Sequence, residues 1–139
     1  KTLAAATEPL ADTGEACASC HTKLGAPKLA LPAEPAAGSG SAPHMRRHAW
    51  ATDAMWMGLS TPSQEAWVRG TEVFADAALE PEEVAGKKSV PAEVTELAKL
   101  AHAAGAQAHD AKPDGRGKAF AKVITTCTTC HEKLSIKPK

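Results

Sequence analysis

The segment PDGRGKAFAKVITTCTTCHEKL, residues 113–134, gives the clearest indication of secondary structure in this chain. A turn-forming Pro-Asp-Gly is followed by apolar side chains that recur every three or four residues, which predicts an amphipathic helix after Gly115. The residues that share its apolar side are Phe120, Val123, Ile124, Cys127, His131 and Leu134. The last turns of this helix therefore contain the motif CTTCH, residues 127–131.

A second copy of this motif, CASCH, occupies residues 17–21, and the two copies contain all four cysteines of the chain. In each copy two thiols stand one helical turn apart, so both can form thioethers with the vinyl groups of one porphyrin while the next imidazole binds the iron. We therefore predict two covalently attached haem c groups. The residues predicted to hold them are Cys17, Cys20 and His21 in the first motif and Cys127, Cys130 and His131 in the second.

Paired cysteines have other uses, namely disulfide bonds, zinc sites and thioredoxin-like redox centres. A zinc site does not require a histidine directly after each pair, and a redox dithiol is typical of a βαβ context that this sequence lacks. The chain has only six histidines, so a histidine at both positions favours haem.

Composition limits the class of protein. A length of 139 residues indicates one domain, and 16 basic against 16 acidic side chains give no reason to expect nucleic acid as a partner. No apolar run approaches the roughly 20 residues of a transmembrane helix. Residues 1–12 resemble the lead-in that follows a cleaved export signal or a tether, and haem is attached to such motifs outside the cytoplasm. We expect a periplasmic or otherwise exported bacterial protein.

The chain divides into residues 1–43, an N-terminal arm with the first haem motif and a Pro/Gly-rich loop over 25–43, and residues 44–139, a helical body. The body is predicted to contain helices over 44–59, from Pro62 to about Ala78, from near Pro91, and after Gly115, with residues 79–89 as a connection. Thr61 is the predicted N-cap of the second helix, and Gln64 is predicted to complete its capping box. The Ala-rich composition without strand patterns predicts an all-α fold.

Four helices that end in a haem motif resemble the layout of cytochrome c′. This resemblance implies an antiparallel four-helix bundle, here with an N-terminal haem-carrying arm. A closer resemblance is to small bacterial mono-haem and di-haem four-helix-bundle cytochromes, in which Met-x-x-His lies on the first helix and Cys-x-x-Cys-His on the last. Here these elements are residues 45–48, MRRH, and residues 127–131, so the likeness covers about residues 44–134. The resemblance implies that His48 is the distal ligand of the iron held by His131. Cytochromes c′ proper differ, because their distal side is apolar and their iron is five-coordinate.

The first iron, held by His21, also needs a distal ligand. His102 is the predicted one, because Ala98, Gly105 and Ala106 are small neighbours that would admit a porphyrin. His44 is the runner-up, one turn before His48 on the same helical stripe, and could instead contact a propionate. His109 is predicted to lie at a solvated helix end.

Other candidate side chains have simpler interpretations. Methionines at helical spacing are more often core residues than thioether ligands, and the three tryptophans are expected to pack against haem or in the core. Arg46 and Arg47 are predicted to form a solvated face. The methionines and tryptophans concerned are Met45, Met55, Met57, Trp50, Trp56 and Trp67.

The function expected from two six-coordinate, bis-histidine haems is one-electron transfer between redox-partner proteins, without enzymatic activity. One alternative is a gas-binding or peroxide-reactive haem protein, which needs an open or displaceable axial site. Another is a redox subunit of a larger membrane electron-transfer complex in respiration or photosynthesis.

Overall fold

The computed structural model describes residues 2–25, 29–75 and 90–135. These ranges contain the α-helices α1 (Thr7–Leu24), α2 (Ser41–Ser60), α3 (Gln64–Glu72), α5 (Ala92–Ala108) and α6 (Arg116–Lys133). Short 3-10 turns occupy Leu3–Ala6, Val73–Ala75 and Pro113–Gly115. No β-strand occurs within the described ranges, which confirms the all-α prediction.

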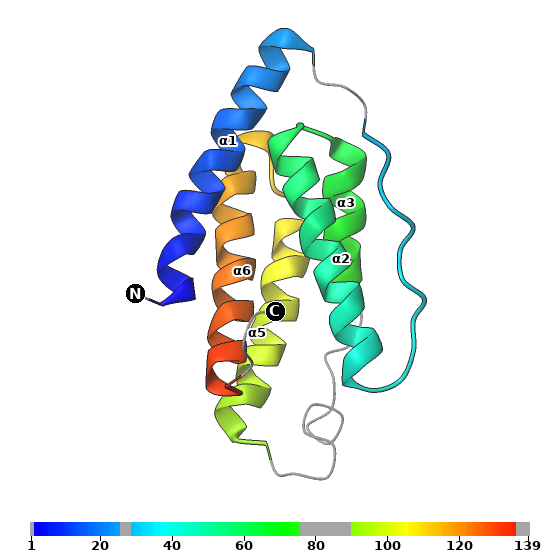
Figure 1. Cartoon of the computed structure of the whole chain (residues 1–139), viewed down its shortest axis with the longest axis vertical. Helices are drawn as coiled ribbons and strands as arrows, with labels where there is room; N and C mark the ends of the chain where they lie inside the picture. Colours follow the sequence, from blue (N-terminus) through cyan, green and yellow to red (C-terminus); the bar gives the residue numbers. More distant parts are fainter. Residues whose placement is uncertain (1, 26–28, 76–89, 136–139) are drawn as a thin grey trace.

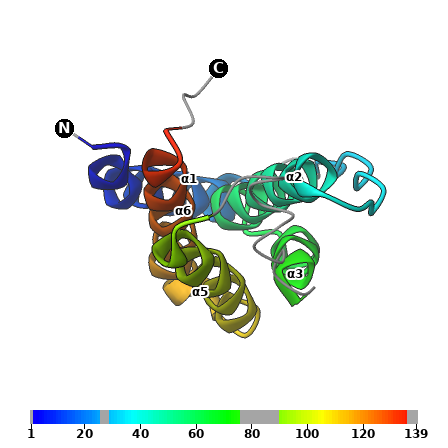
Figure 2. The same cartoon turned by 90° about the horizontal axis from the view of Figure 1, so that it is seen from below.

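The helices lie roughly along the long axis of the molecule (Figure 1). Successive helices from α2 onward alternate in direction, and α6 runs antiparallel to both α1 and α5 (Figure 1). The helix α6 packs against α1, α2 and α5, whereas α3 packs mainly against α2. In the view along the helices, α6 lies between α1 and α5, and α3 lies on the side of α2 (Figure 2). Among the described helices none is both long and apolar enough to cross a bilayer.

Turn-forming residues predict where the last two helices begin. The helix α5 starts at Ala92, directly after Pro91, and α6 starts at Arg116, directly after Gly115, as predicted. The helix α2 starts at Ser41, three residues before its predicted start. The predicted second helix corresponds to α3 and the 3-10 turn that ends at Ala75, while its expected last residues 76–78 and the connection 79–89 lie outside the described residues.

The predicted cap of this second helix is wrong. The N-cap of α3 is Ser63, whose hydroxyl accepts a hydrogen bond from Ala66 N at 3.2 Å. Thr61 instead ends α2, with both its N–H and its hydroxyl donating to Met57 O. Gln64 does not complete a capping box, because its side-chain oxygen accepts a hydrogen bond from the Arg116 guanidinium.

The N-terminal segment is built into the helical body. The first haem motif lies within the 18-residue helix α1, which packs along α6 and α2. Thr7 Oγ1 is 2.6 Å from Thr125 Oγ1, and Leu3 N donates to Glu132 Oε1 at 3.0 Å. The Pro/Gly-rich loop is confirmed for residues 29–38, which have neither helix nor strand, and Trp50 Nε1 donates to Pro32 O at 3.0 Å to tie this loop to α2.

The core contains large side chains that pack against small ones. Trp67 and Phe74 are almost fully buried, and Trp67 Nε1 donates to Ala108 O at 2.8 Å, which joins α3 to the end of α5. Gly105 has no side chain where the ring of Phe74 packs: a Cβ there would lie 2.2 Å from Phe74 Cγ. The α3 region can therefore approach α5 closely enough to bring the Phe74 carbonyl near that helix.

The contact between α2 and α3 at Gly58 gives a stability prediction. A Cβ at this position would lie 2.5 Å from Trp67 N and 2.7 Å from Trp67 Cα, which are backbone atoms that cannot move alone. We expect Gly58→Ala to lower the free energy of unfolding by about 1–3 kcal/mol, as overpacking does. Urea unfolding followed by circular dichroism measures the effect. Gly115→Ala is the control, because nothing lies within 4 Å of its Cβ, and equal losses in both variants would contradict the prediction.

Candidate haem and metal site

A cavity of about 280 Å³ lies between α2, α5 and α6 and brings the second haem motif together with three other histidines. Its apolar walls are mainly aliphatic side chains from all three helices. The lining residues are His44, Met45, His48, Ala49, Thr52, Leu97, Ala98, Ala101, His102, Ile124, Cys127, Thr128, Cys130 and His131. A larger groove, about 800 Å³ between α1, α5 and α6, is lined by charged and small residues without a cysteine or histidine. The smaller cavity is therefore the chemically important one.

The second motif lines this cavity because of helical periodicity. Cys127 and Cys130 are three residues apart on α6, so their thiols lie on one face of the helix, and His131 follows on the same side. Burial, with Cys130 as a second cause, raises the pKa of the Cys127 thiol to about 11, and burial also raises the pKa of Cys130. Both thiols are thus neutral at pH 7 and face an apolar space.

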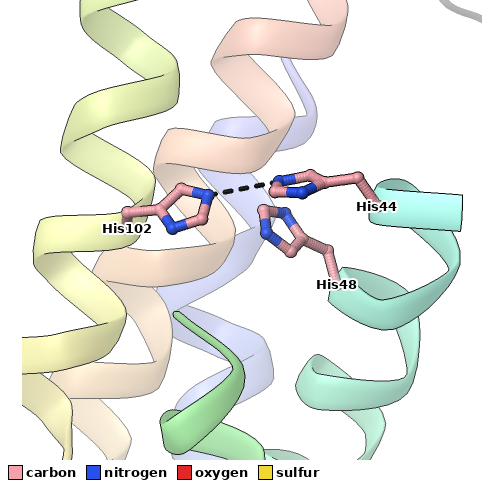
Figure 3. A group of neighbouring side chains, drawn as sticks. All are labelled: His44, His48 and His102. Atoms are coloured by element: carbon pink, nitrogen blue, oxygen red, sulfur yellow. Dashed lines mark hydrogen bonds between the residues drawn. The ribbon is translucent and has the colours of Figure 1, made fainter. Parts of the chain in front are cut away.

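Three imidazoles converge on one another (Figure 3), and they line the same cavity as the second motif. His44 and His48 come from successive turns of α2, and His102 comes from α5. One ring nitrogen of each lies within 4.8 Å of those of the other two. The ring centroids are 4.1 Å apart for His44 and His48, 4.9 Å for His48 and His102, and 5.2 Å for His44 and His102. These residues are called the three-histidine cluster below.

Hydrogen bonds assign the proton positions in two of these rings. His102 Nδ1 is 3.1 Å from Phe74 O, and because a carbonyl oxygen only accepts, Nδ1 carries the proton. The lone pair of His102 is then on Nε2, 3.2 Å from His44 Nε2, which donates to it. A backbone carbonyl that orients an imidazole in this way is a common second-shell arrangement for metal-binding histidines.

His48 differs from its two neighbours in having a nitrogen without a partner. Its Nε2 is inaccessible to solvent and makes no hydrogen bond within the described part of the chain. Burial, followed by the like charges that His44 and His102 would carry, lowers the pKa of His48 to about 3. The ring is therefore neutral at pH 7, the form in which histidine binds metals.

The first motif lies at the other end of α2. His21 Nδ1 is 2.8 Å from Ser60 O, so Nδ1 donates and Nε2 keeps the lone pair that an iron ligand requires. Cys17 is partly buried and Cys20 is exposed on the same helix. The first motif therefore has an oriented histidine and two accessible thiols.

The structure does not bring His102 to His21, so the prediction that these two share an iron must be corrected. Ser60 and His48 are twelve residues apart on α2, which is about 18 Å along a helix that rises about 1.5 Å per residue. His102 contacts the His48 end of α2, whereas His21 contacts the Ser60 end. His44 lies farther still, sixteen residues from Ser60 on α2, which is about 24 Å along the helix. His102 belongs with the second motif because the Phe74 carbonyl and the register of α5 place it there.

The remaining candidates have structural contacts. His109 was predicted to be solvated, but it is partly buried at the end of α5, and its Nδ1 lies 3.1 Å from Thr71 Oγ1. Arg46 is exposed as predicted, whereas Arg47 forms an ion pair of 2.8 Å with Glu34. Trp50, Trp67 and Met55 are buried in the core as predicted, Trp56 and Met57 are partly buried, and Met45 is exposed at the edge of the cavity.

The meeting of His102 with His44 and His48 was not predicted from the sequence. The spacing of His44 and His48, four residues apart on one helix, was the available signal, because such pairs face the same side and can share a metal. No local pattern indicated that His102 would join them. Comparison of the chain with protein-family models, with curated proteins and with solved structures found no match.

Proposed function

We propose that this chain is a di-haem c-type cytochrome that transfers single electrons between redox-partner proteins. The observation that supports this most is the shared cavity, in which Cys127, Cys130 and His131 lie with His48. The Nε2 of His48 is buried and has no hydrogen-bond partner among the described residues. Such an atom costs free energy unless it is satisfied, and binding the iron as an axial ligand would satisfy it.

The donor set fits haem at both motifs. At the second motif Cys127 and Cys130 would form the thioethers, His131 would be the proximal ligand and His48 the distal one. Bound haem would supply an iron that changes its oxidation state by one electron. The protein's part is to keep His48 neutral and to position both imidazoles, while Leu97, Ala98 and Ile124 exclude water from the apolar walls.

The two haems are not equivalent in this proposal. All six histidines fall within the described residues: three form the cluster, His21 and His131 belong to the motifs, and His109 contacts Thr71. Bis-histidine ligation is therefore proposed for the second iron alone. At the first, Cys17, Cys20 and His21 would hold the haem, and His21 would be oriented by the Ser60 carbonyl.

The finer features of the protein follow from the same proposal. We propose that α2, α3, α5 and α6 form the antiparallel four-helix bundle of the related cytochromes, with α1 added along α6. We also propose a periplasmic or exported bacterial location, because haem c is attached outside the cytoplasm. The proposed partners are redox proteins, which include a membrane electron-transfer complex. A gas-binding or peroxide-reactive protein needs an open iron. At the second iron, the position of His48 in the cavity of the second motif favours electron transfer instead.

Haem content tests the proposed function directly. Expressed with a haem-attachment system, the chain should retain two haem masses in denaturing mass spectrometry, because thioether bonds survive unfolding. After metal chelation its reduced and oxidised spectra should show a low-spin haem c. A single haem mass, or zinc in place of haem, would contradict the di-haem proposal.

A further inference from the structure

The second iron needs one distal nitrogen, but the cavity provides three. Once His48 is assigned to the iron, haem ligation does not explain why His44 and His102 converge on the same point. If His48 is the distal ligand, the iron also does not require the Phe74 carbonyl to orient His102. The convergence of three imidazoles therefore requires a separate explanation.

Three imidazoles with converging nitrogens are the donor set of a transition-metal site. Two nitrogens that bind one ion at about 2.0–2.1 Å with tetrahedral angles are about 3.3–3.4 Å apart. His44 Nε2 and His102 Nε2 are already 3.2 Å apart, and the nitrogen of His48 is within 4.8 Å of both. Imidazole ligands favour zinc and copper over calcium or magnesium, which prefer oxygen.

We propose that His44, His48 and His102 form a binding site for a divalent ion of the zinc and copper class, and that this ion competes with the second haem iron for His48. The competition rests on the proposed function, whereas the three-histidine site itself does not. With the ion absent, His48 would be available to bind the haem iron. With the ion bound, all three histidines would hold the ion, and His48 would no longer be available to the iron.

Second-shell contacts support this site. The Phe74 carbonyl holds the proton on His102 Nδ1, so that Nε2 is the ligand nitrogen. His44 is partly exposed and lies at the beginning of α2, so an ion can enter from this side and displace the hydrogen bond between His44 and His102. Binding through His44 Nε2 requires the ring to change its tautomer, so that the proton moves from Nε2 to Nδ1 through solvent and the imidazole stays neutral.

The test is a titration of chelator-treated holoprotein with Zn²⁺, which is redox-inactive and does not change the iron's oxidation state. We expect calorimetry to show one Zn²⁺ per chain, and the optical and EPR spectra to show conversion of one haem from low to high spin. In the holoprotein the cysteines are in thioether bonds, so they do not compete for zinc.

Variants of the cluster separate the two parts of the proposal. His44→Ala and His102→Ala should each weaken Zn²⁺ binding more than about tenfold, while the second haem stays low-spin through His48. His109→Ala, a histidine outside the cluster, should bind Zn²⁺ like the wild type. His44 is partly exposed, so its variant tests the site even if His102→Ala does not fold.

Each outcome is decisive. Failure to bind Zn²⁺, or equal binding by wild type and His44→Ala, would overturn the metal site. Zinc binding that depends on His44 but leaves the haem spectrum unchanged would overturn the competition for His48. If the proposed function fails, mass spectrometry shows fewer than two haems, and calorimetry with the cluster variants still tests the metal site.

Discussion

Replacement of Trp67 by alanine is expected to bring the protein close to unfolding. The side chain is completely buried, its Nε1 donates to Ala108 O at 2.8 Å, and the Arg116 guanidinium lies 5.1 Å from its ring centre. Removal of a buried tryptophan costs about 3–5 kcal/mol, and the Ala108 carbonyl would also lose its donor. Domains of this kind are stable by only about 5–15 kcal/mol, so this loss is a large part of the total.

Urea unfolding measured by circular dichroism provides the test. Trp67→Phe separates packing from hydrogen bonding, because it keeps an aromatic ring but lacks the indole N–H, and it should lose clearly less stability than Trp67→Ala. Trp56→Ala is the matched control, since Trp56 is only partly buried. If Trp67→Ala loses no more than Trp56→Ala, the role assigned to Trp67 as a link between α3 and α5 is incorrect.

The parts of the fold that could be predicted depend on local chemistry. Pro91 and Gly115 lie next to the starts of α5 and α6 because each interrupts helical hydrogen bonding or geometry. The apolar spacing of α6 likewise predicts that Phe120 and Val123 are buried. Such features involve residues only a few positions apart, so a single sequence is enough to recognise them.

Capping was harder to predict because several side chains compete. Thr61, Ser63 and Gln64 all have oxygens near the start of α3, and the choice among them involves a residue far away in the sequence. Arg116, buried at the start of α6, donates to Gln64 and to Gly58 O. Once Gln64 is used in this way, the capping box is lost and Ser63 caps the helix.

The cavity of the second motif was predictable only in part. Cys127, Cys130, His131 and His48 follow from a motif and a resemblance, and the structure puts them around one cavity. His102 was assigned to the other haem because sequence shows the face of a helix but not which neighbour it meets. That neighbour depends on the fit of Phe74 against Gly105, a contact between segments about thirty residues apart.

If the chain binds two haems as proposed, loss of His48 is expected to change the second haem more than any other single substitution in the three-histidine cluster. Its Nε2 makes no hydrogen bond in the described part of the chain, whereas His44 and His102 bind each other at 3.2 Å and His102 is also held by Phe74 O. We therefore expect His48→Ala, in chelator-treated protein, to convert the second haem from low-spin to high-spin and to allow it to bind carbon monoxide.

The measurement is clearest when only the second haem is present, in a background with Cys17→Ser and Cys20→Ser. In that background EPR and optical spectra report one iron, and His109→Ala serves as a histidine control that should remain low-spin. A low-spin His48→Ala would mean that His44 or His102 leaves its hydrogen bond to bind the iron, which the triple alanine variant of the cluster would then reverse. If even the triple variant stays low-spin, the sixth ligand comes from outside the cluster, and the assignment of His48 to the second iron is wrong.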